Sequence, residues 1–148
     1  MGESLGASIL IEAAAIQPAF AALVVECPYA DIREVAEYRV RQMVRAPAFV
    51  AVPAAKTIVS SAMPYARWID GLNIQQVSSL GAIGHTSTPI LLVHGLKDVQ
   101  TPPASHSVEL ARANPRDPLW LVPNAPHTGA AAASDEFRSR VLSWFAEH

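Results

Sequence analysis

The sequence predicts an α/β protein whose centre is a parallel sheet of about three strands. Short, uninterrupted apolar runs at residues 23–25, 90–93 and 119–122 are typical of strands that are buried on both faces. Helix-forming segments alternate with these runs, which favours a parallel sheet. The composition agrees, because hydrophobic residues make up 51% of the 148 residues and charged residues only 16%. A chain of this length is expected to form one domain with one core.

Two helices are predicted in the first third of the chain. Residues 5–17 are rich in Ala, Leu and Ile, and Pro18 follows them, so we expect a buried helix that ends there. Residues 32–44 carry apolar side chains at helical spacing, with charged side chains between them. Asp31 precedes this second segment and is a residue type that caps helix N-termini.

Two more helices are predicted in the last third. Pro102 and Pro103 stand where a helix containing Leu110 would begin, and proline is favoured at such early helical positions. Residues 137–145 carry apolar side chains on one helical face, which predicts an amphipathic terminal helix.

The middle of the chain is expected to form a helical, cap-like insert at residues 32–86, within a single domain that spans residues 1–148. Its later part, residues 46–86, contains breaker residues that would divide it into short helical pieces. These breakers are Pro47, Pro53, Pro64, Gly71, Gly81 and Gly84.

Charge and cysteine content narrow the classes of function. The formal net charge is −2 and no run of Lys or Arg occurs, so we expect a small-molecule substrate rather than nucleic acid or a membrane surface. The single cysteine, Cys27, cannot form an internal disulfide and, within its apolar run, suggests an inert buried thiol. The five histidines lack the close spacing of a metal-binding pair, and no metal or cofactor is expected.

The apolar N-terminal region does not have the pattern of a signal peptide or a membrane span. Glu12, Gln17 and Pro18 interrupt it, and no basic segment precedes it. A cytoplasmic location is therefore the default expectation.

The first residues contain a short motif with a chemical meaning. Gly2-Glu3-Ser4-Leu5-Gly6 fits G-x-S-x-G, in which a serine occupies a strained turn between a strand and a helix. A helix is predicted after Ser4, but no strand before it. Leu5 would present its backbone N–H at the N-terminus of that helix, where it can help to hold an oxyanion. Ser4 could instead be a simple helix cap.

Two further polar residues follow predicted strands: Asp98 in HGLKDVQTPP and His127 in PNAPHTG. Because reactive groups collect beyond the carboxyl ends of parallel strands, we expect both to lie near Ser4. The chain order Ser, Asp, His is the order of the nucleophile-elbow hydrolases. Simpler roles are also open, since Asp98 could be a turn residue with Asp31 as a rival carboxylate, and His127 could be a solvated loop residue. His94 is expected to hydrogen-bond locally.

From its second residue to its last, the chain resembles the C-terminal half of an α/β-hydrolase-fold serine hydrolase. The pieces that carry the resemblance are GESLG, TPILLVHGLKDVQTPP, LWLVPNAPHTG and the terminal amphipathic helix. It is similar in particular to the esterase branch that includes dienelactone-hydrolase-like and prolyl-oligopeptidase-like enzymes. The resemblance implies that Ser4 is the nucleophile, His127 the general base and acid, and Asp98 the carboxylate that orients His127.

Hydrolysis of a carboxylic ester is the expected reaction, while thioesterases and peptidases that use the same kind of site remain open. Met63, Tyr65 and Trp68 in the middle region are expected to line part of an acyl pocket.

Complete proteins of this kind have several strands before the serine turn, and a loop there supplies a second oxyanion N–H. We therefore expect the chain to be a fragment of such a protein, with weak activity or none as a monomer. The strand at residues 23–25 would then have an unpaired edge through which copies of the chain associate. A catalytically weak or inactive fragment that self-associates is the alternative to an active esterase.

Overall fold

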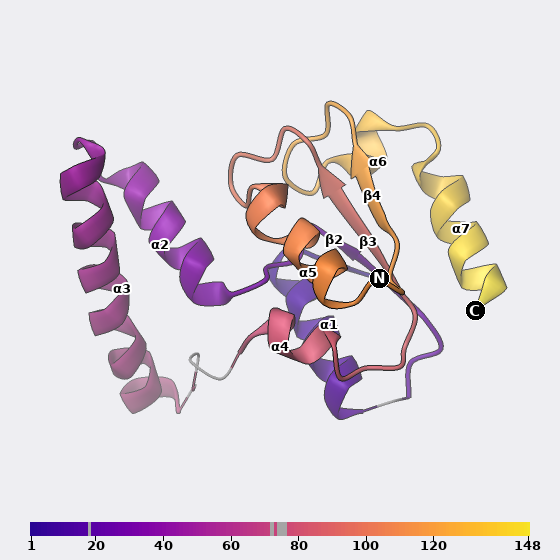
Figure 1. The fold of residues 1–148 in the computed structure, drawn as a ribbon, viewed down its shortest axis with the longest axis horizontal. Helices are drawn as coiled ribbons and strands as arrows, with labels where there is room; N and C mark the ends of the chain where they lie inside the picture. The colour runs from indigo at the N-terminus through magenta and orange to yellow at the C-terminus, as the bar shows by residue number, and fades with distance from the viewer. Residues whose placement is uncertain (18, 72, 74–76) are drawn as a thin grey trace. The chain divides into compact units, whose positions relative to one another are not determined.

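The computed structural model of the chain describes residues 1–17, 19–71, 73 and 77–148. The chain divides into two compact units, and we describe each by itself (Figure 1). The larger unit comprises Met1–Ala30 and Ser79–His148, and the smaller one comprises Asp31–Ser78.

A parallel four-stranded sheet in the order β1-β2-β3-β4 forms the centre of the larger unit. Its strands are β1 (Gly2–Glu3), β2 (Leu23–Glu26), β3 (Ile90–Gly95) and β4 (Leu119–Val122). Every residue of β2 and β3 is buried, as their uninterrupted apolar runs predict. The α/β class and the parallel sheet are therefore confirmed.

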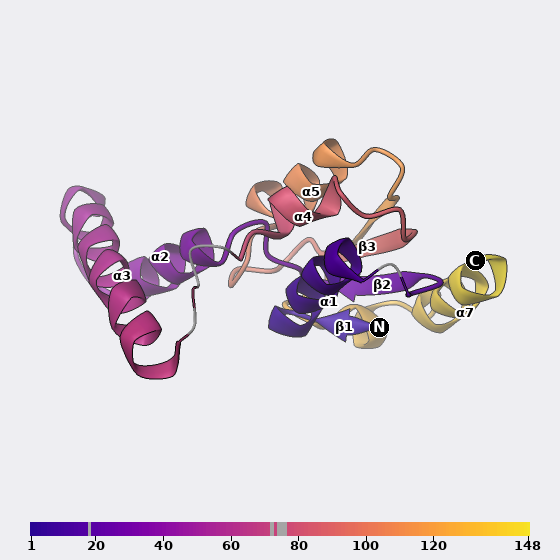
Figure 2. The ribbon, with the colours of Figure 1, turned by 90° about the horizontal axis from the view of Figure 1, so that it is seen from below.

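β1 was not expected, and the prediction that no strand precedes Ser4 is wrong. Gly2 pairs with Val25 and Glu3 with Glu26, so the sheet gains a fourth strand at its edge (Figure 2). Two residues are too few to show an apolar pattern. Residue 2 needs to be a glycine for steric reasons, because a Cβ there would lie 2.6 Å from the Leu10 side chain and 2.8 Å from the carbonyl oxygen of Gly6.

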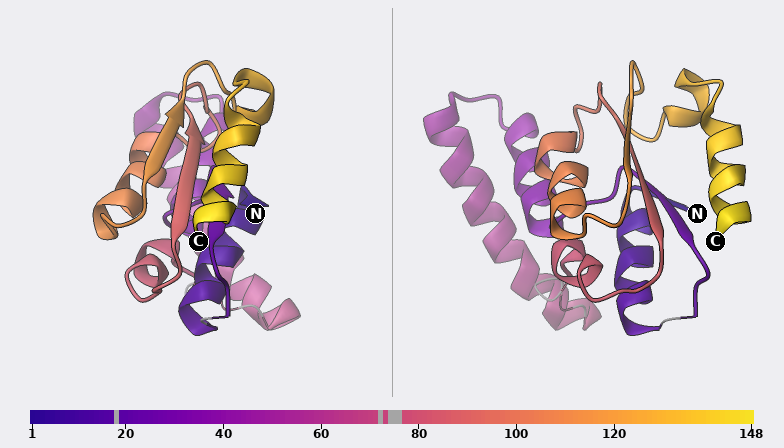
Figure 3. Two further views of the ribbon diagram at one scale, coloured as in Figure 1. Left: turned by 90° about the vertical axis from the view of Figure 1, so that its right-hand side faces the viewer. Right: turned by 45° about the vertical axis from the view of Figure 1, so that its right-hand side comes forward.

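Helices cover both faces of the sheet (Figure 3). On one face lie α1 (Leu5–Ile16), α4 (Ser79–Ile83) and α5 (Ser107–Ala113), and on the other lie α6 (Ala130–Ala133) and α7 (Phe137–Glu147). Neighbouring residues of β2 supply the two cores, since Val25 packs with the first group of helices and Val24 with the second. Because the strands are parallel, their carboxyl ends and the loops that follow them lie along one edge of the sheet, between the two helical layers.

Two helix boundaries differ from the prediction. α1 ends at Ile16, and Pro18 lies outside the described residues. The helix expected after Pro102 is split into a short 3-10 helix, η2 (Pro103–Ser105), and α5. The break is at His106, whose φ of −131° and ψ of −88° are not helical.

The smaller unit contains α2 (Ile32–Met43) and α3 (Ala48–Asp70), which pack against each other. Asp31 caps α2 as predicted, because its Oδ1 accepts the N–H groups of Arg33 at 2.7 Å and Glu34 at 3.3 Å. Across the helix pair, the Arg33 guanidinium donates to Ser60 Oγ at 3.1 Å.

The short helical pieces expected between residues 46 and 70 are wrong, because α3 is one helix of 23 residues with Pro53 and Pro64 inside it. Each proline removes one backbone N–H, a cost that the alanines of the helix and its packing against α2 offset. The helix ends where glycine is required, at Gly71 with φ 68°.

The expected insert at residues 32–86 extends beyond the smaller unit, which ends at Ser78. α4 belongs to the larger unit, where Ile83 is fully buried in the core beside α1. Among the helices of the described residues, none combines the length and the apolar character needed to cross a bilayer.

Candidate active site

Ser4 occupies a tight turn between β1 and α1. Its φ of 52° and ψ of −121° lie in a region that residues other than glycine rarely adopt, at a cost of about 1–3 kcal/mol. The turn is held by a 2.8 Å hydrogen bond from the Ser4 N–H to the carbonyl oxygen of Glu26. Although Ser4 is at the N-cap position of α1, its side chain makes no capping hydrogen bond. The hydroxyl is therefore directed to other partners, and the simple capping role is wrong.

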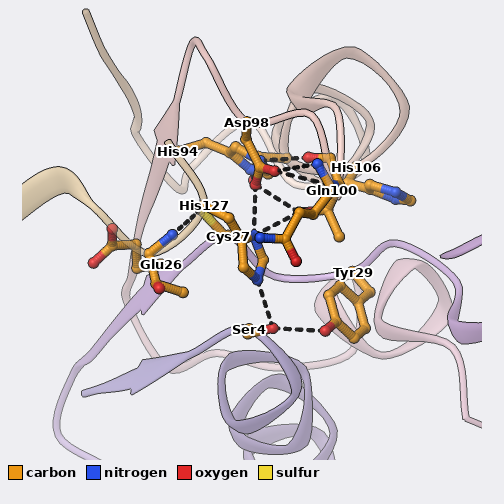
Figure 4. A network of polar contacts seen from close by, with 12 residues as sticks. Ser4, Glu26, Cys27, Tyr29, His94, Asp98, Gln100, His106 and His127 are labelled. Atoms are coloured by element: carbon orange, nitrogen blue, oxygen red, sulfur yellow. Dashed lines mark hydrogen bonds and ion pairs between the residues drawn. The ribbon is translucent and has the colours of Figure 1, made fainter. Parts of the chain in front are cut away.

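The side chains of Ser4, His127 and Asp98 form a continuous path of hydrogen bonds (Figure 4). His127 Nε2 lies 2.9 Å from Ser4 Oγ, and His127 Nδ1 lies 2.7 Å from Asp98 Oδ2. Ser4 follows β1, Asp98 follows β3 and His127 follows β4, so all three come from the carboxyl ends of parallel strands. The structure thus brings together three residues separated by up to 123 positions in the chain.

Packing between two strand-end loops fixes the position of His127 relative to Asp98. Gly95, the last residue of β3, lies so close to the backbone of Ala125 that a Cβ would collide with its carbonyl oxygen. That same oxygen accepts the N–H of Lys97 at 3.0 Å. The loop that carries His127 therefore contacts the loop that carries Asp98 through backbone atoms.

Asp98 is a buried carboxylate surrounded by donors. Its Oδ1 accepts the backbone N–H groups of Gln100 at 2.8 Å and Thr101 at 2.9 Å, and its Oδ2 accepts the Thr101 hydroxyl at 2.7 Å. Burial alone would raise the pKa of Asp98, but the hydrogen bonds from His94, Thr101 and His127 outweigh it and hold the pKa well below its ordinary value. Asp98 is thus both the expected turn residue and an ionised partner of His127.

His94 supports Asp98 from the interior side. Its Nε2 lies 2.7 Å from the carbonyl oxygen of Thr101 and 3.1 Å from Asp98 Oδ2, so Nε2 carries the proton. Its Nδ1 then accepts the hydroxyl of Ser107. The sequence predicted local hydrogen bonding for His94 but not its contact with Asp98. The two residues are four positions apart across a turn, and this spacing could have indicated the contact.

Glu26 holds the other end of the loop that carries His127. This residue is 1% exposed, and its Oε1 accepts the N–H of Ala130 at 2.8 Å. Burial raises the pKa of Glu26, more than the hydrogen bond from Ala130 lowers it. No sequence pattern marked this residue, because an acidic side chain at a strand end is usually exposed.

Cys27 is buried, as predicted, directly after β2. Burial raises the pKa of its thiol to about 12. Its Sγ, a nitrogen of His127 and a carboxylate oxygen of Asp98 lie within 4.8 Å of one another, which is the spacing of a possible metal site. The protonated thiol and the direct bond between His127 and Asp98 both oppose metal binding there.

Tyr29 is a residue of the site that sequence reasoning missed. Its hydroxyl oxygen lies 2.6 Å from Ser4 Oγ, which therefore contacts both Tyr29 and His127 (Figure 4). The Tyr29 N–H donates to Ser8 Oγ on α1 at 2.7 Å. The available signal was its position, three residues beyond the end of β2 at the edge where Ser4 was expected.

The remaining predicted site residues do not join this network. Leu5 is the first residue of α1, so its N–H lies in the first helical turn, where N–H groups have no partner within the helix. Met63, Tyr65 and Trp68 lie on α3 in the smaller unit. Met63 is buried beside a groove of about 330 Å³ between α2 and α3, whereas Tyr65 and Trp68 are 61% and 79% exposed.

No protein-family profile and no curated protein matches the chain. Several solved structures share its fold. BpoC of Mycobacterium tuberculosis H37Rv has a TM-score of 0.65 at 22% identity, with 99% of this chain and 65% of that chain covered. MGS-MChE2, an α/β hydrolase from the metagenome of Mar Chica lagoon sediments in Morocco, has a TM-score of 0.63 at 20% identity, with 99% and 59% covered.

The esterase Pf2001 of Pyrococcus furiosus has a TM-score of 0.69 at 18% identity, with 99% of this chain and 51% of that chain covered. The chain thus spans less than two thirds of the length of these three proteins. At such identities the similarity establishes the fold and not the activity. The chain has the α/β-hydrolase fold, of which it carries a part.

Proposed function

We propose that the chain is a serine hydrolase that cleaves carboxylic esters through an acyl-enzyme on Ser4. The observation that carries this proposal is the path of hydrogen bonds from Ser4 through His127 to Asp98. A serine hydroxyl is a poor nucleophile at neutral pH, and an imidazole at 2.9 Å can remove its proton during attack. The strained turn at Ser4 supports the same role, because such strain concentrates at functional sites.

In the first half-reaction, Ser4 Oγ attacks the carbonyl carbon of the ester while its proton passes to His127 Nε2. The π electron pair of the carbonyl moves to its oxygen, which becomes an oxyanion. When this intermediate collapses, the bond to the alcohol breaks and His127 gives its proton to the alcohol oxygen. Asp98 stays ionised and stabilises the imidazolium that exists between these two transfers.

In the second half-reaction, a water molecule attacks the acyl carbon and gives a proton to His127 Nε2, while the π electron pair of the carbonyl again moves to its oxygen and returns when the intermediate collapses. The bond between the acyl carbon and Ser4 Oγ then breaks, and Oγ takes the proton from His127. The carboxylic acid leaves and the free serine is restored. Both halves use His127 Nε2 first as an acceptor and then as a donor of the same proton.

The N–H of Leu5 is proposed as one donor to the oxyanion. It lies next to the nucleophile, in the first turn of α1, where the helix dipole also favours negative charge. Met63, Tyr65 and Trp68 stay a proposal for the acyl pocket, resting on their apolar or aromatic character. The reaction as written uses only side chains, backbone and water.

Esters are proposed on the sequence resemblance to the esterase branch, because the fold itself is shared by an esterase, Pf2001, and by a puromycin-hydrolyzing peptidase of Mycobacterium tuberculosis and so does not separate these substrate classes. The same acyl-enzyme chemistry would serve all three classes. A small-molecule ester as partner and a cytoplasmic location stay predictions from the sequence.

A second candidate is an inactive, self-associating chain. Within the described residues, β1 pairs with β2 only at Val25 and Glu26. The edge of the sheet beside β1 could therefore pair with a strand from a second copy. An oligomer found by light scattering in a protein that does not label at Ser4 would favour this candidate.

The proposal is tested by incubating the protein with p-nitrophenyl acetate and with a fluorophosphonate probe. Ser4 should become labelled, and Ser4→Ala should abolish both labelling and ester turnover. The matched control is Ser139→Ala, which removes an exposed hydroxyl bonded to the carbonyl oxygen of Glu136. A parent protein whose ester turnover equals that of Ser4→Ala would contradict the proposal.

A further inference from the structure

The hydrogen atoms of the Ser4 network can be assigned from its acceptors. Asp98 is ionised and can only accept, so His127 Nδ1, 2.7 Å away, carries a proton. In the neutral imidazole, Nε2 is then the acceptor, and Ser4 donates its one O–H to it. The contact between Ser4 Oγ and the Tyr29 hydroxyl oxygen leaves a single arrangement, in which Tyr29 donates and Ser4 accepts.

We propose that Tyr29 is a catalytic residue: its O–H donates to Ser4 Oγ and stabilises the negative charge that develops on that oxygen. This inference rests on the proposed function and adds a residue to it. The 2.6 Å distance is at the short end for a hydroxyl pair, as expected for a strong hydrogen bond.

The position of Tyr29 is fixed at both its backbone and its ring. Its N–H donates to Ser8 Oγ, one turn along the helix that begins after Ser4, so Tyr29 and Ser4 are held by the same helix. The ring contacts the imidazole of the buried His106 at 6.3 Å between ring centroids. Tyr29 as a whole is half-buried. A donor held in this way is ready before the reaction begins.

The hydrogen bond from Tyr29 changes in strength along the reaction. An ester oxygen is a weaker acceptor than an oxygen that is gaining negative charge, so the bond is weakest in the acyl-enzyme. During deacylation, the bond between the acyl carbon and Oγ breaks and its electron pair moves to Oγ. There Tyr29 stabilises the pair until His127 delivers the proton. Acylation gains less, because the bond from Tyr29 to Oγ already exists in the free protein.

This difference distinguishes Tyr29 from a residue that merely positions Ser4. Loss of positioning would slow attack by Oγ at least as much as its departure. Loss of a donor to Oγ slows its departure more than its attack, because only departure starts from a state in which the bond is weak.

The test uses Tyr29→Phe, which keeps the ring, in the full chain. The burst of p-nitrophenol from p-nitrophenyl acetate gives the acylation rate constant. Loss of the acetyl group from Ser4 after removal of excess ester, followed by mass spectrometry of the intact protein, gives the deacylation rate constant. We expect deacylation to fall about tenfold or more and acylation to fall less, since hydrogen bonds to charged groups are the stronger ones. Tyr38→Phe on α2 is the matched control and should change neither rate constant.

The possible outcomes are separable. Unchanged rate constants in Tyr29→Phe, or acylation reduced as much as deacylation, would overturn the role of Tyr29 and leave the proposed function intact. A parent protein that forms no acetyl-enzyme on Ser4 would overturn both. Ser8→Ala, which frees the Tyr29 backbone, should add no further loss of deacylation in the Tyr29→Phe background if Ser8 acts only through the Tyr29 hydroxyl.

Discussion

Two buried carboxylates at the ends of neighbouring strands respond to burial in opposite ways. Glu26 ends β2 and is 1% exposed, and Asp98 follows β3 and is 4% exposed. The pKa of Glu26 is raised, because burial outweighs the hydrogen bond from Ala130. The pKa of Asp98 is lowered, because burial is outweighed by hydrogen bonds from His94, Thr101 and His127. The donors around each carboxylate, rather than its depth, therefore decide its charge.

The two carboxylates also act on the same loop in different ways. Asp98 binds the imidazole of His127 and fixes which nitrogen carries the proton. Glu26 binds the backbone three residues later, at Ala130. One carboxylate thus orients the proposed base, and the other anchors the segment on which the base lies.

Among the variants that test the comparison of the two carboxylates, Asp98→Asn has the largest expected effect. The side-chain NH₂ group of asparagine, in place of Oδ2, can donate to His127 Nδ1. The ring proton then moves to Nε2, and no nitrogen of His127 can accept the Ser4 proton. We expect esterase kcat to fall about 10³- to 10⁴-fold, as for the loss of an orienting carboxylate in other serine hydrolases. Steady-state turnover of p-nitrophenyl acetate measures the effect.

The matched control for Asp98→Asn is Asp31→Asn. Like Asp98, Asp31 follows a strand, in its case β2, and it accepts two backbone N–H groups as the cap of α2. Asparagine caps helices about as well as aspartate, so this variant should retain turnover. An Asp98→Asn protein as active as the Asp31→Asn protein would remove Asp98 from the mechanism.

A smaller effect is expected at Cys27, where burial acts on a thiol beside the same two carboxylates. With a pKa raised to about 12 by burial, the thiolate fraction at pH 8 is about 1000-fold below that of a free cysteine. Ellman's reagent should react with the unfolded protein in urea at least that much faster than with the folded protein. Equal rates in the two states would show that the thiol at the end of β2 is accessible and ionised.

The elements with strong local patterns could be predicted from the sequence. The apolar runs of β2, β3 and β4 fixed the class of the sheet, and Asp31 marked the start of α2. β1 was missed because two residues carry no periodicity. α3 was divided wrongly because the cost of Pro53 and Pro64 was weighed without the packing of α2 against the same helix.

The candidate site divides in the same way. Ser4, Asp98 and His127 could be named because each follows a strand or starts a helix and because their order matches a known pattern. Tyr29 and Glu26 could not, since their contacts with Ser4 and Ala130 bridge 25 and 104 positions of the chain. Such contacts depend on the register of β1 and β2 and on the path of the loop after β4, which no local pattern states.

The smallest expected effect comes from Glu26→Gln, which tests whether burial governs this carboxylate. The folded-state pKa of Glu26 lies above its ordinary value of 4.5, so folding binds a proton more tightly and the free energy of unfolding falls as the pH rises through that pKa. Glutamine keeps an oxygen for the Ala130 N–H but has no charge to bury. We expect Glu26→Gln to match or exceed the parent at pH 7, by up to about 1 kcal/mol, and to be closest to it near pH 4. Urea unfolding at the two pH values measures this, with Glu147→Gln, at an exposed glutamate on α7, as the control. A variant less stable than the parent at pH 7 would show that Glu26 is stabilised as an anion, like Asp98, and that the contrast between the two carboxylates does not hold.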